Sequence, residues 1–414
     1  MKIGFISQWY DPEGGAAAGP GTIARALAKR GHDVQVITGF PIYPEGRVFP
    51  EYSLKPYQRE QLRGVTVHRF PIYPSHDTRV AHRMLNYASF ATSGAIGAPA
   101  VLKDADVNFV YSTPATAAVP ALTVQLTRKT PFVAQIQDLW PQTVTSSAFV
   151  NDGRVRHIER ILNTFCDGVY SRAASIAVTS PGMIDLIAER GIARDKLHFV
   201  PNWAEEASFH PVPRDPQLAA ELGLDRRFTV MYAGNLGEMQ NLEHLISAAE
   251  RVQDLADLQI AIVGSGVMEN SLRKIVETKG LDNVRFIPPQ PFSRMSRILA
   301  LGDAQIVTLK DVPLYRSTLP SKLQANLAAG RPIIGAVTGD ASQVVVSSGA
   351  GRTVPPGDSA ALGRAIRELH AMPHSELSAL GDAARRHYVF NFSEHLIAER
   401  LDQLLVAAAE GNSR

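Results

Sequence analysis

The sequence has little cysteine, no long run of one charge and no metal-ligand spacing. Cys166 is the single cysteine among 414 residues, which excludes an internal disulfide framework and predicts a reducing, cytoplasmic location. Lys and Arg total 42 against 40 Asp and Glu, so overall charge gives no reason to expect nucleic acid as a partner. The 12 histidines show no ligand spacing, and we expect neither a metal nor another cofactor. The first seven residues already have the pattern of a strand, so no signal peptide is expected.

One uncharged stretch approaches the length of a membrane span. No charged residue occurs from Met84 to Leu102, and Arg79 and Lys103 flank this run. Its serines, glycines and Pro99 make it too polar and too broken to cross a bilayer. Two interpretations stay open: a helix buried in the first half of the chain, or a peripheral membrane contact through residues 79–103.

Short apolar runs rich in Val and Ile alternate with helical patterns along the whole chain. Strands of this near-continuous apolar type are typical of parallel sheets that are covered on both faces. The pattern therefore predicts open, doubly wound α/β sheets. The expected strands are Lys2–Ser7, Val34–Thr38, Val107–Tyr111, Phe132–Ile136, Ser175–Thr179, Leu197–Pro201, Thr229–Ala233, Gln259–Val263, Val284–Ile287, Gln305–Leu309, Pro332–Ala336 and Arg352–Pro355.

The length and a proline-rich, charged stretch divide the chain into two halves. A chain of 414 residues exceeds one ordinary core, and residues 205–227 have the composition of a linker. Each half opens with a strand, a glycine-bearing turn and a helix; the turns contain Gly14 and Gly15 in the first half and Gly234–Gly237 in the second. Two such Rossmann-like domains are expected to face each other across a cleft at the carboxyl ends of their strands.

The segment Arg316–Pro332 is expected to be a loop that leads into a short helix. Pro320 suits the first helical turn, and Gly330 marks the end. The candidate N-caps are Ser317, Thr318 and Ser321. A helix start offers free N–H groups and a positive dipole end, and Arg316 and Lys322 add two formal charges there, which together suit a phosphate. The alternative is a capped surface helix with solvated basic residues.

An ordered set of short motifs runs along essentially the full chain. The motifs are Gly14–Gly15, Pro41–Gly46, Asp138–Pro141, Pro201–Trp203, Gly234–Gln240, Gly264–Gly266, Pro320–Lys322 and Ala328–Pro332. Their order is similar to that of retaining glycosyltransferases of the GT-B architecture, in the large family 4 group. Within that group the chain most resembles the branch that builds bacterial O-antigen, capsule and colanic-acid-type polysaccharides.

The resemblance implies an activity and a domain organisation. It implies sugar transfer from a nucleotide diphosphate sugar, a UDP-sugar by preference of the branch, with the anomeric configuration kept and no required metal. The acceptor would be a lipid-linked sugar or an oligosaccharide, and the enzyme would be cytoplasmic or peripheral at the inner face of the membrane. The implied domains are an acceptor-side domain 1–204 completed by a C-terminal helix at about 393–414, the linker 205–227 and a donor-binding domain 228–392.

The chain departs from the family at the residues that usually hold the donor. Many members carry an Arg and a Lys in the turn that opens the second domain, where this chain has Asn235 and Gln240. A pair of glutamates spaced by seven residues is replaced by Ser317 and Ala325. Since Lys322 lies within the segment that lost its acids, we hypothesise that positive charge has moved there and meets the diphosphate.

The expected site therefore has a donor side and an acceptor side. Asp138 follows a strand at its carboxyl end, and it either orients or deprotonates the acceptor hydroxyl or caps the next segment; Glu13 is a second candidate. Lys322 completes the predicted catalytic set. The predicted donor-binding residues are Gly14, Gly15, Gly234, Asn235, Gln240, Gly264, Gly266, Arg316, Pro320 and Ser321.

Two further functions fit the same architecture. A sugar-nucleotide epimerase would need acidic and histidine residues in the cleft that the sequence does not offer in an evident place. A non-catalytic relative that supports a partner transferase is the other alternative, because the usual Arg, Lys and Glu pair are missing. Acceptor-dependent release of nucleotide separates transfer from both alternatives.

Overall fold

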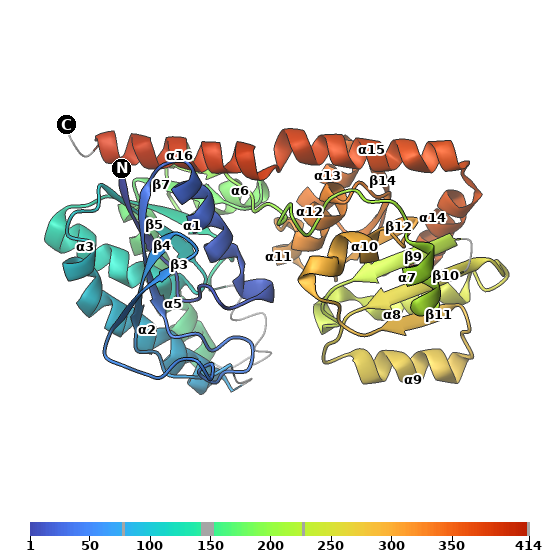
Figure 1. Ribbon diagram of the computed structural model, residues 1–414, viewed down its shortest axis with the longest axis horizontal. Coiled ribbons are helices and arrows are strands. Elements are labelled where there is room, and N and C mark those ends of the chain that lie inside the picture. The colour runs from blue at the N-terminus through green and yellow to red at the C-terminus, as the bar shows by residue number, and fades with distance from the viewer. Residues whose placement is uncertain (77–78, 142–152, 226–227, 412–414) are drawn as a thin grey trace. The chain divides into compact units, whose positions relative to one another are not determined.

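The computed structural model describes residues 1–76, 79–141, 153–225 and 228–411 (Figure 1). The chain forms two compact units: unit 1 comprises Met1–Pro201 with Ile397–Arg414, and unit 2 comprises Asn202–Leu396. Residues 226–227 of the expected linker and 412–414 of the expected last helix lie outside the described residues. Both units are built on a mainly parallel sheet, which confirms the predicted α/β class.

The sheet of unit 1 has eight strands in the order β3-β4-β2-β1-β5-β6-β7-β8. All neighbouring strands are parallel except β3 and β4, and the order reverses on either side of β1, as in a doubly wound sheet. The strands are β1 (Lys2–Ile6), β2 (Asp33–Gly39), β3 (Gln58–Leu62), β4 (Val65–Phe70), β5 (Val107–Ser112), β6 (Phe132–Ile136), β7 (Ser175–Val178) and β8 (Leu197–Phe199).

The hairpin formed by β3 and β4 was not predicted from the sequence. Arg63 and Gly64 form its two-residue loop, and both have positive φ angles, 50° and 82°. The strand Gln58–Leu62 is polar and lies at the sheet edge, so the apolar pattern that marks the other strands is absent there.

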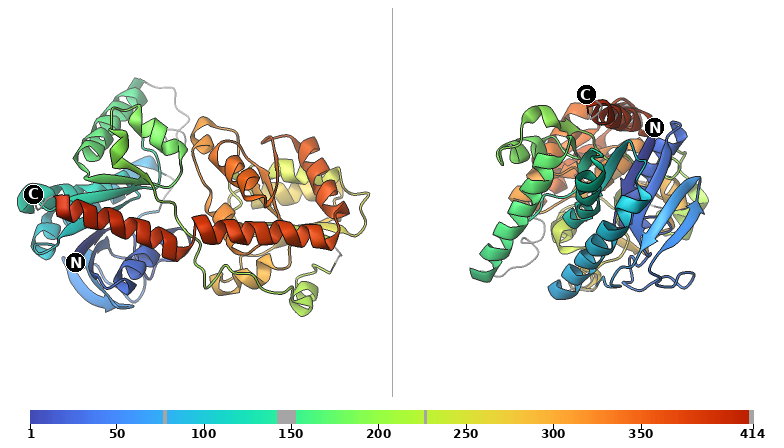
Figure 2. Two further views of the ribbon diagram at one scale, coloured as in Figure 1. Left: turned by 90° about the horizontal axis from the view of Figure 1, so that it is seen from above. Right: turned by 90° about the vertical axis from the view of Figure 1, so that its left-hand side faces the viewer.

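Helices cover both faces of the sheet of unit 1 (Figure 2). Their bounds are α1 (Gly19–Lys29), α2 (Val80–Val101), α3 (Val119–Arg128), α5 (Gly153–Arg172) and α6 (Gly182–Ala188), with short 3-10 turns η1 (Gly15–Ala17), η2 (Ala115–Ala118) and η3 (Arg194–Lys196). The last helix, α16 (Glu394–Gly411), runs along unit 1, where Asp402 bonds to Arg30 at 3.0 Å and to His32 at 2.8 Å (Figure 1). Residues far apart in the chain thus form one core.

Helix α2 settles part of the question about the uncharged stretch. Its inner face contains the buried side chains of Phe90 and Ala98. On the same face, Oδ1 of Asn86 accepts a hydrogen bond from Nε2 of Gln8, in the loop after β1, at 2.7 Å. Its outer face is exposed, with Leu85 and Ile96 at 50% and 78% exposure. Among the described residues, no helix is long and apolar enough to cross a bilayer. The helix is therefore partly buried and partly presented to its surroundings.

The sheet of unit 2 has six parallel strands in the order β11-β10-β9-β12-β13-β14. They are β9 (Phe228–Ala233), β10 (Leu258–Val263), β11 (Val284–Ile287), β12 (Ala304–Thr308), β13 (Ile333–Ala336) and β14 (Gly351–Val354). The helices are α7 (Pro216–Glu221), α8 (Leu242–Glu250), α9 (Glu269–Lys279), α10 (Met295–Leu299), α11 (Pro313–Arg316), α12 (Ser321–Ala328), α13 (Asp340–Ser348), α14 (Ser359–Ala371) and α15 (His374–Asn391), with η4 (Glu238–Gln240) and η5 (Phe292–Arg294).

The core of unit 2 follows from the predicted periodicities. Leu242, Leu245, Ile246 and Ala249 of α8 are buried against the apolar strands, as their helical spacing indicates. Within the expected linker, Asp215 caps α7 by accepting bonds from the amides of Gln217 and Leu218, so this stretch is partly helical rather than extended throughout.

Candidate functional site

The turn that follows β9, at Gly234–Gly237, lies at the centre of the predicted donor-binding residues of unit 2. The amide of Gly234 donates to the carbonyl of Val263, and the amide of Leu236 donates to that of Ser265, at 2.9 and 2.8 Å. The carboxyl ends of β9 and β10 are thereby joined into one surface of backbone groups. Ligands of open α/β sheets bind at this edge, beside the point where the strand order reverses.

Glycine is required where the two turns meet. Gly264 has φ +137°, and a Cβ at this position would lie 2.0 Å from the carbonyl oxygen of Gly234. Gly266 would likewise place a Cβ 2.5 Å from the carbonyl oxygen of Leu236. The structure therefore gives these two predicted donor residues a local role, the close stacking of one turn on the other.

Lys322 approaches this turn from α12. A Cβ added at Gly234 would lie 2.5 Å from its Cε and 3.3 Å from its Nζ. The ammonium lies 5.3 Å from the ring centre of Tyr232, and among the described residues no carboxylate pairs with it. Burial lowers the pKa of the Lys322 ammonium to about 8. Burial therefore disfavours the charged form of this lysine, and such a lowered pKa is typical of residues at functional sites, where a bound anion would stabilise the charge.

The start of α12 differs from the prediction in one respect. Pro320 occupies the N-cap position itself, with φ −68° and ψ 136°, and no side chain caps the helix. The expectation that Ser317, Thr318 or Ser321 caps it was wrong: the Thr318 hydroxyl donates to the carbonyl of Leu314 in the preceding helix instead. Because proline cannot cap with its side chain, the amides of Ser321 and Lys322 stay available to a ligand, whereas that of Leu323 donates to the carbonyl of Pro320 at 2.8 Å.

Arg316 is placed differently from Lys322. Its guanidinium bonds Asp311 through Nε and Nη2 at 3.1 and 3.2 Å, and the Thr338 hydroxyl donates to the same carboxylate at 3.3 Å. The Asp311 carboxylate raises the pKa of Arg316. Arg316 is thus paired with a carboxylate, whereas Lys322 has no such partner in the part of the chain that the structure describes.

Asn235 and Gln240 are brought together around one glycine. A Cβ at Gly237 would lie 2.8 Å from Nδ2 of Asn235 and 2.7 Å from Oε1 of Gln240. The carbonyl of Asn235 accepts a hydrogen bond from the Tyr232 hydroxyl at 2.6 Å, which fixes the turn. Two neutral amides therefore flank Gly237, and they stand at the positions where the resemblance implies basic side chains.

In unit 1, Glu13 is buried and fully engaged with the backbone. One carboxylate oxygen accepts from the amides of Ile42 and Tyr43, both at 2.8 Å, and the other accepts from Tyr10 at 3.0 Å. Burial raises the pKa of the Glu13 carboxyl, and the three backbone hydrogen bonds oppose this shift. These contacts tie together the loops that follow β1 and β2.

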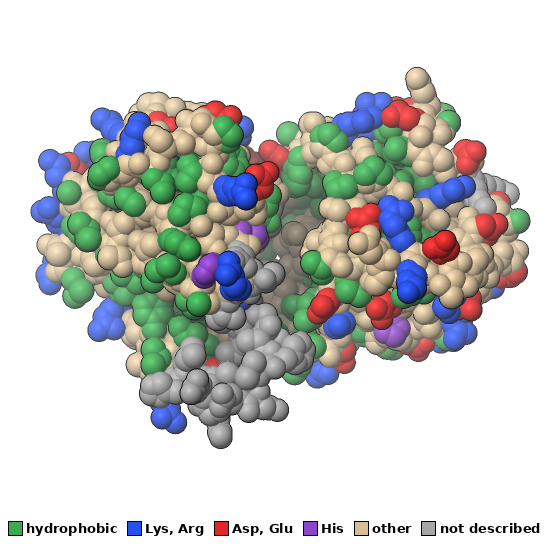
Figure 3. Space-filling model, turned by 90° about the horizontal axis from the view of Figure 1, so that it is seen from below, with side chains coloured by type: hydrophobic (Ala, Val, Ile, Leu, Met, Phe, Trp, Pro, Cys, Tyr) green, Lys and Arg blue, Asp and Glu red, His purple; other side chains and the backbone are tan. Residues whose placement is uncertain are grey.

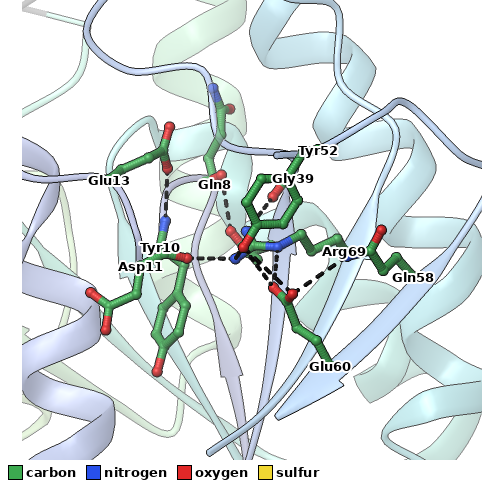
Figure 4. A network of polar contacts seen from close by, with 10 residues as sticks. Gln8, Tyr10, Asp11, Glu13, Gly39, Tyr52, Gln58, Glu60 and Arg69 are labelled. Atoms are coloured by element: carbon green, nitrogen blue, oxygen red, sulfur yellow. Dashed lines mark hydrogen bonds and ion pairs between the residues drawn. The ribbon is translucent and has the colours of Figure 1, made fainter. Parts of the chain in front are cut away.

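A buried arginine holds the same loops from the other side (Figure 4). Arg69 on β4 is 0% exposed, and it donates to Glu60 at 2.6 Å, to the carbonyl of Gly39 at 3.0 Å and to the carbonyl of Asp11. Its guanidinium also stacks on Tyr52, 4.8 Å from the ring centre. The loops at the carboxyl ends of β1 and β2 are therefore rigidly supported.

Asp138 lies just after β6 in a different environment. Its carboxylate accepts one hydrogen bond, from the Thr113 hydroxyl at 3.4 Å. Burial raises the pKa of the Asp138 carboxyl, and the bond from Thr113 opposes this only in part. Unlike Glu13, Asp138 keeps acceptor capacity that no backbone amide takes up in the described part of the chain.

Gly14 and Gly15 lie on the exposed loop after β1. A Cβ at either position would meet nothing within 4 Å, although Gly15 has φ +62° and favours glycine for that reason. The loop therefore has room beside it that a ligand could occupy. Within the described ranges no group of three or more His, Cys, Asp and Glu residues is arranged to hold a metal ion.

Sequence analysis missed three residues that shape these sites: Tyr232, Asp311 and Arg69. Tyr232 could have been noticed as a tyrosine near the end of a buried strand, two residues before the glycine turn. The pairing of Asp311 with Arg316 and the buried place of Arg69 depend on tertiary contacts that the sequence pattern does not reveal.

Comparison with known proteins places the chain in a family. Residues 14–203 match the family described as glycosyl transferase 4-like domain, and residues 215–387 match glycosyl transferases group 1. A glycosyl transferase of Escherichia coli K12, WcaI, provisionally assigned to colanic acid biosynthesis, is 31% identical over 80% of this chain and 82% of its own. WbjE of Pseudomonas aeruginosa, provisionally named a glycosyltransferase, is 27% identical over 65% of this chain and 66% of its own.

Solved structures show the same fold at low identity. Sucrose-phosphate synthase from Thermosynechococcus elongatus superposes with a TM-score of 0.72 at 18% identity, covering 97% of this chain and 98% of that one. HepE from Anabaena, solved in complex with UDP, gives a TM-score of 0.72 at 15% identity, covering 98% and 100%. The fold is that of the GT-B glycosyltransferases. This chain belongs to the glycosyltransferase family that includes WcaI, as the resemblance predicted.

Proposed function

We propose that this glycosyltransferase moves a sugar from a UDP-sugar to a lipid-linked or oligosaccharide acceptor with retention of the anomeric configuration. The observation that carries the proposal is the unpaired ammonium of Lys322 against the Gly234 turn. A diphosphate leaving group gains negative charge as the sugar bond breaks, and a preorganised cation lowers the energy of that state.

The donor side of the proposal is built within unit 2. Lys322 contacts the diphosphate as a point charge, and the free amides at the start of α12, at Ser321, add donors from the same direction. Asn235 and Gln240 donate neutral hydrogen bonds in place of the usual basic side chains. The solved complex of HepE with UDP supports a uridine nucleotide, since that protein shares the fold.

In this proposal Arg316 binds the donor only if its guanidinium leaves Asp311 for a phosphate. Its bond to Asp311 is exposed, with both side chains more than 40% accessible. Exposed pairs of this kind contribute little free energy, so a phosphate can compete for the guanidinium. Within unit 1, Gly14 and Gly15 leave open space beside the loop after β1, and we propose that this space takes part of a substrate.

On the acceptor side we assign the reacting hydroxyl to Asp138 rather than Glu13. Among the described residues, no backbone amide donates to the oxygens of Asp138, whereas both Glu13 oxygens already accept from amides. Glu13 then positions the loop that bears Gly14 and Gly15. The bond between the sugar carbon and the phosphate oxygen breaks, the acceptor oxygen bonds to that carbon, and its proton passes to Asp138 or to the departing phosphate.

Transfer is tested by incubating the protein with UDP-, GDP- and dTDP-sugars, with and without membrane extract as the source of acceptor. The proposal predicts nucleotide release that requires the acceptor, and a product whose anomeric proton coupling matches the donor. Release or interconversion without acceptor would instead indicate hydrolysis or epimerisation. Binding without any turnover would indicate a non-catalytic relative.

We further propose that α2 contacts the membrane that carries the acceptor. Its outward face is uncharged along the whole helix and consists of Ala81, Leu85, Ala88, Thr92, Ile96 and Ala100. Arg79 and Lys103 flank the helix at its two ends. Figure 3, the view from below, shows hydrophobic side chains spread over the described surface of unit 1 with Lys and Arg among them. This composition suits the surface of an anionic bilayer.

The double variant Leu85→Glu, Ile96→Glu is expected to lower binding to phosphatidylglycerol vesicles by more than about tenfold, because each buried aliphatic side chain contributes roughly 1.5–3 kcal/mol. Vesicle sedimentation measures the effect. The control is Val346→Glu on α13, a similarly exposed aliphatic residue of unit 2. Equal vesicle binding by the double variant and the native protein would refute the membrane contact.

A further inference from the structure

Two tyrosines beside Asp138 have no part in the site described so far. Tyr111 is on β5 and Tyr87 is on α2, so the three side chains come from three different elements. The negative charge of Asp138 acts on both tyrosines and, after burial, is a cause of the raised pKa of each hydroxyl. The three groups therefore face a common region at the carboxyl edge of the sheet of unit 1.

The position of the Tyr111 hydroxyl is fixed by a glycine. A Cβ at Gly19, the first residue of α1, would lie 2.8 Å from this oxygen. The hydroxyl therefore lies over the start of α1, which no side chain caps. On the other side of Asp138, the ring of Tyr87 packs on Trp140 with ring centres 5.8 Å apart. The region thus combines a carboxylate, two hydroxyls and an aromatic edge.

The two hydroxyls differ from the other tyrosine hydroxyls whose bonds the structure defines. Those of Tyr232 and Tyr388 donate to backbone carbonyls, and that of Tyr57 bonds to His68. Among the described residues, neither Tyr87 nor Tyr111 has a hydrogen-bond partner for its hydroxyl, although Tyr111 is only 8% exposed. A nearly buried hydroxyl without a protein partner is expected to bond water or a ligand.

We infer that Tyr87 and Tyr111 bind the acceptor sugar and orient its reacting hydroxyl toward Asp138. A neutral tyrosine donates one hydrogen bond and accepts another, which matches the hydroxyls of a pyranose ring. Asp138 accepts the hydrogen of the reacting hydroxyl, and the tyrosines hold the neighbouring oxygens. The inference rests on the proposed function and specifies its acceptor side.

The test uses Tyr111→Phe and Tyr87→Phe in the full chain, with octyl glucoside, octyl galactoside and octyl N-acetylglucosaminide as acceptor probes. Each variant is expected to raise KM for the acceptor about five- to tenfold, the effect of losing one neutral hydrogen bond, while KM for the nucleotide sugar and the melting temperature stay within error. A purely structural role would change the melting temperature and both KM values together.

The matched control is Tyr10→Phe, because the Tyr10 hydroxyl is fully buried and out of reach of any ligand, whereas Tyr111 keeps 8% exposure. It is expected to leave both KM values unchanged. An unchanged acceptor KM in both test variants, or a rise confined to the donor KM, would overturn the inference while the proposed function stands. No transfer by the native protein to any octyl glycoside or to membrane extract would overturn both.

Discussion

Replacing Lys322 by methionine is expected to lower kcat by a factor of about 10²–10³ and to raise the melting temperature of the unliganded protein. The loss of turnover follows from removing a preorganised cation at the developing charge of the leaving group. The gain in stability follows from the pKa of about 8, which lies below the ordinary value of 10.5. Charging this lysine in the folded state costs free energy that methionine does not require.

The pH dependence of this stability effect has a defined sign. Because the folded pKa is depressed, the charged lysine destabilises the fold fully below pH 8, and this cost fades as the pH rises from about 8 to 10.5. Differential scanning calorimetry of the native protein and Lys322→Met should therefore give melting temperatures that differ most near pH 7 and converge above pH 10.

The control for Lys322→Met is Lys274→Met, because Lys274 is an exposed lysine on α9. It should leave both turnover and melting temperature nearly unchanged. If Lys322→Met retained native turnover, the ammonium would have no catalytic part. If Lys322→Met were less stable than the native protein, Lys322 would be a structural residue of the turn.

Asp138→Asn is expected to lower kcat by roughly 10²–10⁴, the range of a lost proton acceptor, without unfolding the protein. Asparagine keeps the size of the side chain and still accepts the bond from Thr113. Burial raises the pKa of Asp138, so the activity of the native protein should increase with pH as this carboxyl ionises. The residual activity of Asp138→Asn should not show this increase. A profile of kcat/KM against pH measures both effects.

Glu13→Gln separates the two acidic candidates. A neutral amide replaces one acceptor oxygen by a donor, so one of the bonds from the amides of Tyr10, Ile42 and Tyr43 is lost. The expected result is a lower melting temperature with a smaller loss of kcat than in Asp138→Asn. Greater loss of kcat in Glu13→Gln than in Asp138→Asn, at unchanged stability, would reverse the assignment.

Local patterns predicted most of the fold because the strands are apolar and β-branched along their length. The run Leu258–Val263 is fully buried in the sheet, and such runs are recognisable without tertiary information. The hairpin of β3 and β4 was not predicted because Gln58–Leu62 is a polar edge strand. Its side chains are exposed or half-buried, so it lacks the apolar run that marks the other strands. Its turn, Arg63-Gly64, was the available signal.

The candidate site was predicted less completely, because it is formed by side chains that are far apart in the sequence and come into contact only in the folded protein. The sequence predicted that Arg316 and Lys322 lie together at one helix start, with Lys322 in the catalytic set and Arg316 among the donor-binding residues. The structure separates them: Asp311 pairs with Arg316 across a short loop, and Lys322 reaches back to Gly234, 88 positions earlier in the chain. Neither partner can be derived from spacing, since each depends on how α11 and α12 pack on the sheet.

The account depends on the Lys322 ammonium meeting a diphosphate, and an NMR titration of its side chain tests this directly. The protein is labelled with ¹³Cε-lysine, the Lys322 resonance is identified by its loss in Lys322→Met, and its pKa is measured without nucleotide and with UDP, GDP or dTDP. We predict a value near 8 in the free protein and a clear increase with at least one nucleotide. A pKa that none of the three diphosphates changes would contradict the account.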